Sequence, residues 1–351
     1  MTGELIVKNK PFTIYDIART AGVSVGTVNR ALHNKSQISE ETRERVLKIA
    51  TEMNFKVNHI AQSLGRKPRK IGALLVCPVK EFLNDVKNGV ESAFLDLIEY
   101  NIIGDIRVID TSDGYNKDNE ITGCLSDFMN NKYDGVVALT SGNNEQYIKE
   151  LLKLRKAGIP VSTITNDIAE SKRLFHVGMD GECAGRMAAQ MLWLLCKNKK
   201  VALLTGSIET EIHKRNIVGF NSFAKIHNFN KLIIYKHHDK SEYVIEQTEL
   251  LLKEHPDLDG IYITSASSLS ICGYLHEKGI KSINIIATDL FTETRALIES
   301  GFLCATIFQD PYKQGYDSVQ YMYKHITNLW NEHDVKIIPQ LVMLSNIDLY
   351  E

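Results

Sequence analysis

The chain has 351 residues, with 41 lysines and arginines against 43 aspartates and glutamates, and 44% of its residues are hydrophobic. This composition is typical of globular proteins and excludes the disordered and fibrous classes. No segment approaches the roughly 20 consecutive apolar residues of a membrane-spanning helix, and the first ten residues lack the pattern of an export signal. We therefore expect two or three domains, a cytoplasmic location and no membrane partner.

Cysteines and glycines give no sign of a cofactor. The six cysteines are scattered without a C-x-x-C pair, which favours free thiols in a reducing compartment over disulfides or zinc. No strand-like run is followed by the glycine motif of a dinucleotide site or a P-loop. His237 and His238 would point to opposite faces of a strand, so a surface loop is favoured over a metal site. We expect neither a metal nor an organic cofactor.

Charge divides the chain unevenly. Residues 1–70 hold 13 basic and 6 acidic residues, a balance of +7, whereas residues 71–351 hold 28 and 37, a balance of −9. Four basic residues fall within residues 66–70. Such a run is commonly a solvated linker, but it also favours a polyanion as a partner.

Capping residues and periodicity predict three helices near the N-terminus. Thr13 can cap a first helix, in which apolar residues recur at helical spacing up to Gly22. Ser24 can cap a second helix, and Ser39 can cap a third that runs to Met53. Two short helices joined by a tight glycine-containing turn predict a helix-turn-helix unit.

The second predicted helix has a face that packing does not require. Val28 belongs to the apolar side, whereas Val25, Gly26, Asn29 and Arg30 lie on the other. That second face could enter the major groove of DNA. The same pattern also fits a small helical subdomain with a solvated face.

Residues 22–26, Gly-Val-Ser-Val-Gly, also match the G-x-S-x-G motif of serine hydrolases. That motif needs a strand before the serine, but a helix is predicted there. Ser24 is also needed as the N-cap of the second predicted helix. The pattern places no base and acid beside this serine. A hydrolase is therefore the weakest alternative.

From residue 71 onward, apolar runs typical of buried strands alternate with segments of helical period. The clearest runs are residues 71–77, 106–110, 134–140, 159–165, 201–205, 232–235, 259–264, 283–288 and 303–308. Strands with little polar alternation are buried on both faces, which indicates a parallel α/β architecture. About eleven such runs exceed one ordinary open sheet. We predict two Rossmann-like lobes with a ligand cleft between them, at the carboxyl ends of the strands.

The N-terminal residues resemble those of a known family. Residues 13–32 (TIYDIARTAGVSVGTVNRAL), 38–46 (ISEETRERV) and 58–64 (NHIAQSL) are similar to the headpiece of the lactose-repressor (LacI/GalR) family of bacterial transcription regulators. This match runs without a gap. The resemblance implies a headpiece that binds operator DNA.

Individual DNA-binding roles follow from the same resemblance. Val25, Gly26 and Arg30 take base-reading positions, and an arginine can pair with guanine through two hydrogen bonds. Leu64 matches a hinge-helix leucine that inserts into the minor groove. The other implied DNA-binding residues are Thr13, Ser24, Thr27, Asn29, Ser39, Asn58 and Ala61.

The rest of the chain is similar to the periplasmic-binding-protein-like effector domain of that family. Its landmarks are residues 177–186 (VGMDGECAGR), Ala287-Thr-Asp289 and residues 305–311 (ATIFQDP). The resemblance implies that the chain crosses between lobes near residues 165–167, 301–306 and 330–336. The implied domains are a helix-turn-helix headpiece at 1–57, a hinge helix and linker at 58–70, and a two-lobed effector-binding and dimerisation domain at 71–351.

Effector-binding residues are also implied by the resemblance. Asp289 and Gln309 match positions that hydrogen-bond ligand hydroxyls in sugar-binding members, and a carboxylate and an amide suit polyols. Phe82 matches an aromatic that stacks on a sugar ring. The remaining candidates, Asn166, Asn216, Asp239 and Thr264, depart from the sugar pattern. Asn216 stands where the family usually has an arginine, although the adjacent Arg215 could substitute for it. We expect a small polar effector, a sugar or polyol, whose identity these departures leave open.

The predicted function is that of a non-enzymatic transcription repressor. Two copies would bind a near-palindromic operator, and the effector would alter the spacing of the dimer. The chain ends at residues 347–351 without a leucine-heptad tail, which predicts a dimer rather than a tetramer. A solute-binding transport component would share the two-lobed clamp, but it should be exported and has no use for residues 1–65.

Overall fold

The computed structural model describes residues 12–32, 38–53, 55, 67–140, 145–197, 200–208, 210–227, 232–238, 241–330 and 333–350. The chain forms two compact units, Met1–Lys67 and Pro68–Glu351. Four of the candidate residues, Asn58, Ala61, Leu64 and Asp239, lie outside the described residues, as does most of the predicted hinge helix.

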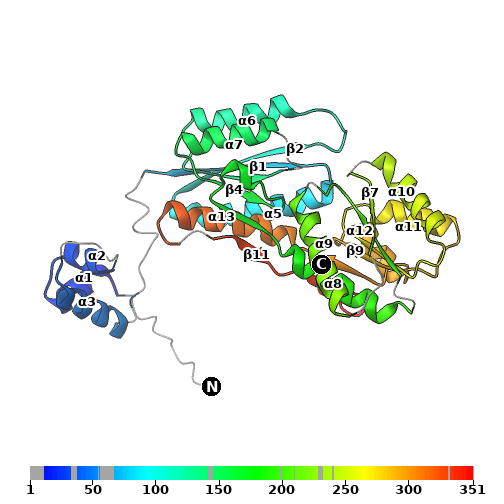
Figure 1. Cartoon of the computed structure of the whole chain (residues 1–351). Helices are drawn as coiled ribbons and strands as arrows, with labels where there is room; N and C mark the ends of the chain where they lie inside the picture. Colours follow the sequence, from blue (N-terminus) through cyan, green and yellow to red (C-terminus); the bar gives the residue numbers. More distant parts are fainter. Residues whose placement is uncertain are drawn as a thin grey trace, which may run out of the picture. The chain divides into compact units, whose positions relative to one another are not determined.

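The first unit contains the three predicted helices, α1 (Ile14–Ala21), α2 (Val25–Leu32) and α3 (Glu40–Glu52), coloured blue in Figure 1. Gly22 ends α1 with a φ of 65°, a left-handed conformation that glycine adopts without strain. Apolar side chains from all three helices form one small core, centred on Ile17, Val28 and Val46, which are fully buried. The helix-turn-helix prediction is confirmed.

In its described residues, the second unit has two six-stranded sheets. The sheet of lobe 1 has the order β11-β5-β4-β3-β1-β2, and its strands are β1 (Arg69–Cys77), β2 (Ile102–Asp110), β3 (Gly135–Leu139), β4 (Val161–Ile164), β5 (Phe175–Met179) and β11 (Val335–Ile337). The sheet of lobe 2 has the order β12-β10-β9-β8-β6-β7, and its strands are β6 (Val201–Thr205), β7 (Ile233–Lys236), β8 (Gly260–Ile263), β9 (Asn284–Thr288), β10 (Ala305–Phe308) and β12 (Gln340–Val342). All pairings are parallel except that of β10 with β12.

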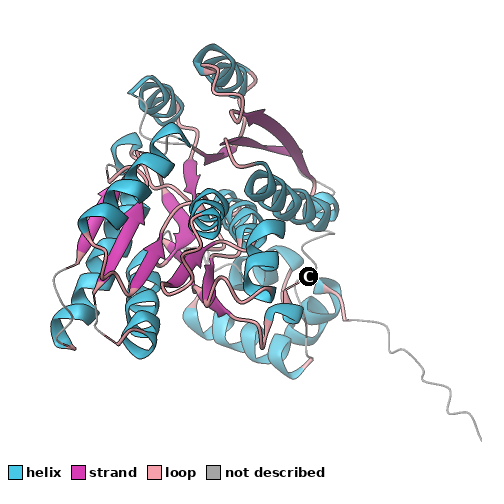
Figure 2. Cartoon of the chain, turned by 90° about the vertical axis from the view of Figure 1, so that its right-hand side faces the viewer, coloured by secondary structure: helices cyan, strands magenta, loops and turns pink. Residues whose placement is uncertain are grey.

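Helices cover both faces of each sheet, as Figures 1 and 2 show. In lobe 1, α5 (Lys80–Leu97) and α13 (Pro311–Ile326) pack on one face, and α6 (Asp118–Asn130) and α7 (Glu145–Lys156) on the other. In lobe 2, α8 (Gly181–Leu195) and α9 (Glu211–Ile226) oppose α10 (Ser241–Glu254), α11 (Ser268–Glu277) and α12 (Thr292–Glu299). Short 3-10 helices are η1 (Ile98–Tyr100), η2 (Ala169–Ser171) and η3 (Ile347–Leu349).

Strand β1 explains why the apolar runs lack polar alternation. Ile71, Ala73 and Leu75 enter the core beneath α5 and α13, while Leu74 and Val76 enter the core beneath α6 and α7. Because successive side chains point to opposite faces and both faces are covered, every position must be apolar. The predicted two-lobed parallel architecture is confirmed.

The predicted lobe crossings are misplaced. Within the described residues the chain passes between the lobes at Asp180, between β5 and α8, at residues 309–310, between β10 and α13, and at residues 338–339, between β11 and β12. Residues 165–167 instead connect two strands of lobe 1, and residues 301–306 lie within lobe 2. Strand β5 of lobe 1 lies between the implied first crossing at residues 165–167 and the observed one at Asp180.

No helix in the described part of the chain is long and apolar enough to cross a membrane.

Candidate functional sites

Helix α2 presents one exposed side. Gly26, Asn29 and Arg30 are exposed, whereas Val28 and Ala31 are buried against the other two helices. Packing therefore uses one side of α2 and leaves the other available for contact. The predicted base-reading residue Val25 is partly buried at the start of this side and also packs against the small core.

Several polar DNA-binding candidates of the headpiece form hydrogen bonds at the N-terminal ends of its helices. The Thr27 amide donates to Ser24 Oγ at 3.1 Å, and the Thr42 amide donates to Ser39 Oγ at 3.3 Å. The amide and hydroxyl of Thr13 donate to one carboxylate oxygen of Asp16 at 2.9 and 2.7 Å. Since helix α1 precedes Ser24, the strand required by the hydrolase motif is not there.

A cleft of about 690 Å³ lies between the lobes of the second unit. Every effector candidate that the structure describes lines it: Phe82, Asn166, Asn216, Thr264, Asp289 and Gln309. Asp289, Gln309 and Thr264 directly follow β9, β10 and β8. The carboxyl ends of neighbouring parallel strands meet at one edge of a sheet, which brings these distant residues together.

Asp289 is the central charged group of the cleft. It is 7% exposed, and its Oδ1 accepts a hydrogen bond of 2.6 Å from Gln309 Nε2. Within the described part of the chain, no hydrogen bond reaches its Oδ2. Burial raises the pKa of Asp289 to about 6, and the Gln309 hydrogen bond opposes this shift. Asp289 is thus an ionised acceptor at neutral pH that a ligand hydroxyl can reach.

A chain of side-chain amides connects Asp289 to lobe 1. Gln314 is fully buried on α13, and its Nε2 donates to the backbone oxygen of Gln309 at 2.8 Å. Its Oε1 accepts from Thr165 Oγ1 at 2.8 Å. Thr165 and Asp289 both have positive φ angles, of 62° and 72°, a strained backbone that the surrounding contacts maintain. The carboxylate of Asp289 is therefore positioned by contacts from both lobes.

Two histidines that sequence reasoning missed line the lobe 2 wall. His213 Nδ1 lies 3.1 Å from Thr264 Oγ1, which donates onward to Thr205. His237 Nε2 lies 2.9 Å from Ser265 Oγ. The prediction that His237 belongs to a surface loop is wrong, because it is 1% exposed at the carboxyl end of β7. The position of His237 just after a predicted strand was the sequence signal that could have identified it as a cleft residue.

Asn216 and His213 reach the cleft because α8 and α9 pack closely. A Cβ atom at Gly185 would lie 2.1 Å from the backbone oxygen of Asn216, and one at Gly219 would lie 2.0 Å from that of Glu182. Only glycine allows this approach of two backbones. Asn216 is then buried, and its Oδ1 accepts from Tyr262 OH at 2.7 Å.

The described lining of the lobe 1 wall has no charged side chain and combines apolar groups with the hydroxyls of Thr111, Ser112, Thr140 and Thr165. Val79, Phe82 and Leu139 line it, and Phe82 is anchored in the core between α5 and the sheet. Asn166 adds a polar group, but its Nδ2 donates to the backbone oxygen of Thr140 at 2.7 Å. This wall therefore offers shape and a ring face more than charge.

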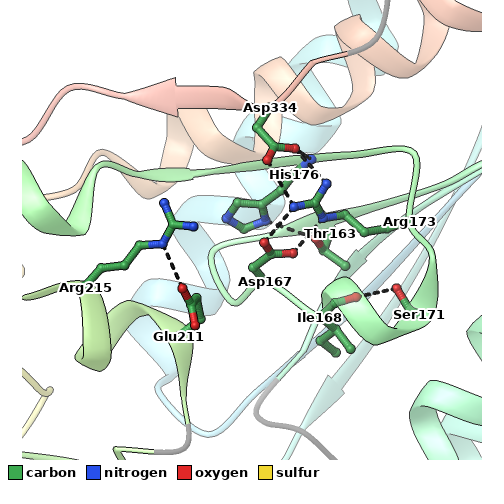
Figure 3. Close-up of polar contacts among 9 residues, drawn as sticks. All are labelled: Thr163, Asp167, Ile168, Ser171, Arg173, His176, Glu211, Arg215 and Asp334. Carbon is green, nitrogen blue, oxygen red and sulfur yellow. Dashed lines mark hydrogen bonds and ion pairs between the residues drawn. The ribbon is translucent and has the colours of Figure 1, made fainter.

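A separate polar cluster lies beside the first lobe crossing (Figure 3). Arg173 donates to both Asp167 oxygens at 2.6 Å and to Asp334 at 2.7 Å. Burial lowers the pKa of the neighbouring His176 to about 4, and Asp167 opposes this shift. Arg215 donates to Glu211 at 3.0 Å in the same region. Arg215 therefore does not replace a cleft arginine, as its position beside Asn216 suggested.

Known protein families match both parts of the chain in which these sites lie. Residues 13–58 match the model of bacterial regulatory proteins of the lacI family, and residues 75–329 match the periplasmic binding protein domain. The chain belongs to the lacI family. The match of both domains in one chain identifies a DNA-binding transcription regulator and removes the transport alternative, which has no use for the first domain.

Relatives of the regulator match it over most of its length. It is 25% identical over 288 residues to catabolite control protein A of Priestia megaterium, covering 81% of this chain and 83% of the relative. It is 24% identical over 336 residues to the ribose operon repressor of Lactococcus lactis subsp. lactis, covering 90% and 91%. A putative LacI transcriptional regulator from Bacteroides fragilis superimposes with a TM-score of 0.70 at 22% identity, covering 81% of this chain and 100% of that structure.

Proposed function

We propose that this regulator is a homodimeric repressor that binds a near-palindromic operator in the cytoplasm and responds to a sugar or polyol in its cleft. Its functional division is a headpiece at 1–57, a hinge helix and linker at 58–70 and an effector domain at 71–351. The observation that carries the proposal is Asp289, a buried carboxylate hydrogen-bonded to Gln309 in a cleft that Phe82 also lines, within a chain that also has a lacI-family headpiece.

The headpiece roles follow from the exposed side of α2. Arg30 reads base edges in the major groove, with Val25 and Gly26 at the groove floor. Phosphates bind to exposed caps and helix ends, where amides and hydroxyls are available. Leu64 enters the minor groove at the operator centre. The residues assigned to phosphate and backbone contact are Thr13, Ser24, Thr27, Asn29, Ser39, Asn58 and Ala61.

The effector roles follow from donors and acceptors. Asp289 and Gln309 bind adjacent hydroxyls, while Phe82 packs against the ring. Asn166, Asn216 and Thr264 add polar contacts from both walls, and Asp239 is assigned a contact by its position after β7. A relative that represses the ribose operon supports a sugar as the effector.

Dimerisation is supported by exposed apolar residues beside the edge strand of lobe 1. Leu95 and Ile98 are more than 60% exposed at adjacent turns next to β2, which ends its sheet. A second copy would cover them. Sedimentation velocity should give a dimer for the full chain and a monomer for Leu95→Asp with Ile98→Asp. A monomeric wild-type chain at micromolar concentration contradicts the dimer.

Operator binding is tested by fluorescence anisotropy with a selected palindromic duplex over a salt series. The logarithm of affinity should fall linearly with the logarithm of salt concentration, because phosphate contacts release counterions. Arg30→Ala should change base preference by about 1–3 kcal/mol at one position of each half-site. Asn29→Ala should weaken all sequences equally. Binding that is absent, or insensitive to salt, contradicts the proposed function.

A further inference from the structure

The charged side chains that line the cleft are acidic. Among the described lining residues, the carboxylates are those of Asp289 and Glu242, and the lining contains no lysine or arginine. The other polar lining groups are hydroxyls, amides and two imidazoles. A hydroxyl or amide can bind any polar ligand, but a buried carboxylate repels an anion.

Three cations near the first lobe crossing are engaged outside the cleft. Arg215 pairs with Glu211, Arg173 is held by Asp167 and Asp334, and Lys336 donates to Asp180 at 3.2 Å. Figure 3 shows the two arginines with these carboxylate partners. Moving a guanidinium into the cleft would break an ion pair and leave a carboxylate partner without its cation.

We propose that the effector site selects uncharged polyols and rejects sugar phosphates and sugar acids. The inference rests on the proposed function, since it concerns the ligand class of that same cleft. Asp289 Oδ2 accepts from ligand hydroxyls, which suits a donor-rich neutral ring. A ligand phosphate or carboxylate beside Asp289 would face its negative charge at close range. Arg173, Arg215 and Lys336 could not offset that repulsion, because they are already paired with carboxylates outside the cleft.

Isothermal titration with matched ligands tests the selection. The panel contains D-glucose with D-gluconate and glucose 6-phosphate, D-galactose with D-galacturonate, D-ribose with ribose 5-phosphate, and myo-inositol with its monophosphate. Within each ligand set of which any member binds, the uncharged compound should bind at least 30-fold more tightly than its anionic derivatives. An anion that binds within threefold of its parent, or more tightly, overturns the proposal.

Three variants sharpen the measurement. Asp289→Asn removes the repelling charge with little change of shape, so the ratio of neutral to anionic affinity should fall at least fivefold. Arg215→Gln, beside the first lobe crossing, should leave the ratio unchanged. Lys240 lies outside the described residues, and Lys240→Ala should also leave it unchanged. A ratio that rises in either of the last two variants would place a cation in the cleft and overturn the proposal.

Operator binding is measured on the same samples, which separates the two failures. If no uncharged member binds at 10 mM while salt-sensitive operator binding persists, the ligand class is overturned and the regulator stands. If operator binding itself is missing, the proposed function fails.

Discussion

The two walls of the cleft differ in chemistry although the two lobes share one architecture. Among the described lining residues, lobe 1 contributes apolar side chains, hydroxyls and one amide, whereas lobe 2 contributes both carboxylates and both histidines. Each wall is built from strand ends of a six-stranded sheet. The comparison shows that a repeated fold fixes where a ligand binds, while the residues after each strand decide which wall carries the charged groups.

The largest expected effect comes from the wall of lobe 2. Asp289→Asn should weaken binding of an uncharged effector about 100-fold, because a charged acceptor is replaced by a group that also presents donors. Isothermal titration measures the loss. Asp348→Asn, an exposed carboxylate of the same lobe, is the matched control and should change affinity less than twofold. Equal affinities of the Asp289 variant and wild type would remove Asp289 from the site.

The wall of lobe 1 should contribute less to effector affinity than the wall of lobe 2. Phe82→Leu should weaken effector binding about tenfold, because the ring face is lost while much of the volume stays. Phe94→Leu is the control: Phe94 is buried on the same helix and does not line the cleft. Both variants should lower the melting temperature, and only Phe82→Leu should lower affinity. An equal loss in both would show that Phe82 acts through lobe stability alone.

The amide link between the walls gives a third test. Gln314→Met should destabilise the protein by about 1–3 kcal/mol, because Thr165 and Gln309 lose a buried hydrogen-bond partner. Urea denaturation measures this cost. Effector affinity should fall about threefold, because Gln309, which donates to Asp289, loses the hydrogen bonds that fix it. A stability equal to that of the wild type would show that the lobes position Asp289 without Gln314.

The smallest effects distinguish the lobes by the sign of their pH dependence. His176 of lobe 1 has its pKa lowered by burial from 6.5 to about 4, so its contribution to stability is lost as pH falls through that interval. Asp289 of lobe 2 has its pKa raised by burial from 3.8 to about 6, so its contribution is lost as pH rises through about 6.

Urea denaturation at pH 7 and pH 5 tests these opposite signs. His176→Gln should remove a loss of stability on acidification, and Asp289→Asn should remove a gain. The double variant should therefore show the flattest profile. Profiles that change in the same direction in both single variants would contradict the assigned shifts.

Much of the fold could be predicted from the sequence, for reasons seen in particular segments. Strand β1 was predictable because both its faces are buried, which leaves an uninterrupted apolar run. Strands β5 and β11 were missed: β5 is short and contains His176, and β11 has three residues, one of them exposed. Such strands are defined by their neighbours in the sheet more than by their own composition.

The candidate site was predictable only in part. Asp289, Gln309 and Phe82 were found because they lie in segments that resemble a family. His213 and His237 were missed because their role depends on which strand and helix ends face the same cleft. Arg215 was misjudged for the same reason, since one position along α9 changes the direction of a side chain by about 100°.

The sequence alone determined the headpiece and the alternation of strands and helices, because caps, turns and apolar periods act between residues close in the chain. Only the tertiary structure decided where the chain crosses between lobes, which wall holds the charge and where the arginines are paired. Those features depend on contacts such as that of Thr165 with Gln314, which are 149 positions apart. Local patterns cannot specify such contacts, because they form only when segments far apart in the chain have come together in the folded protein.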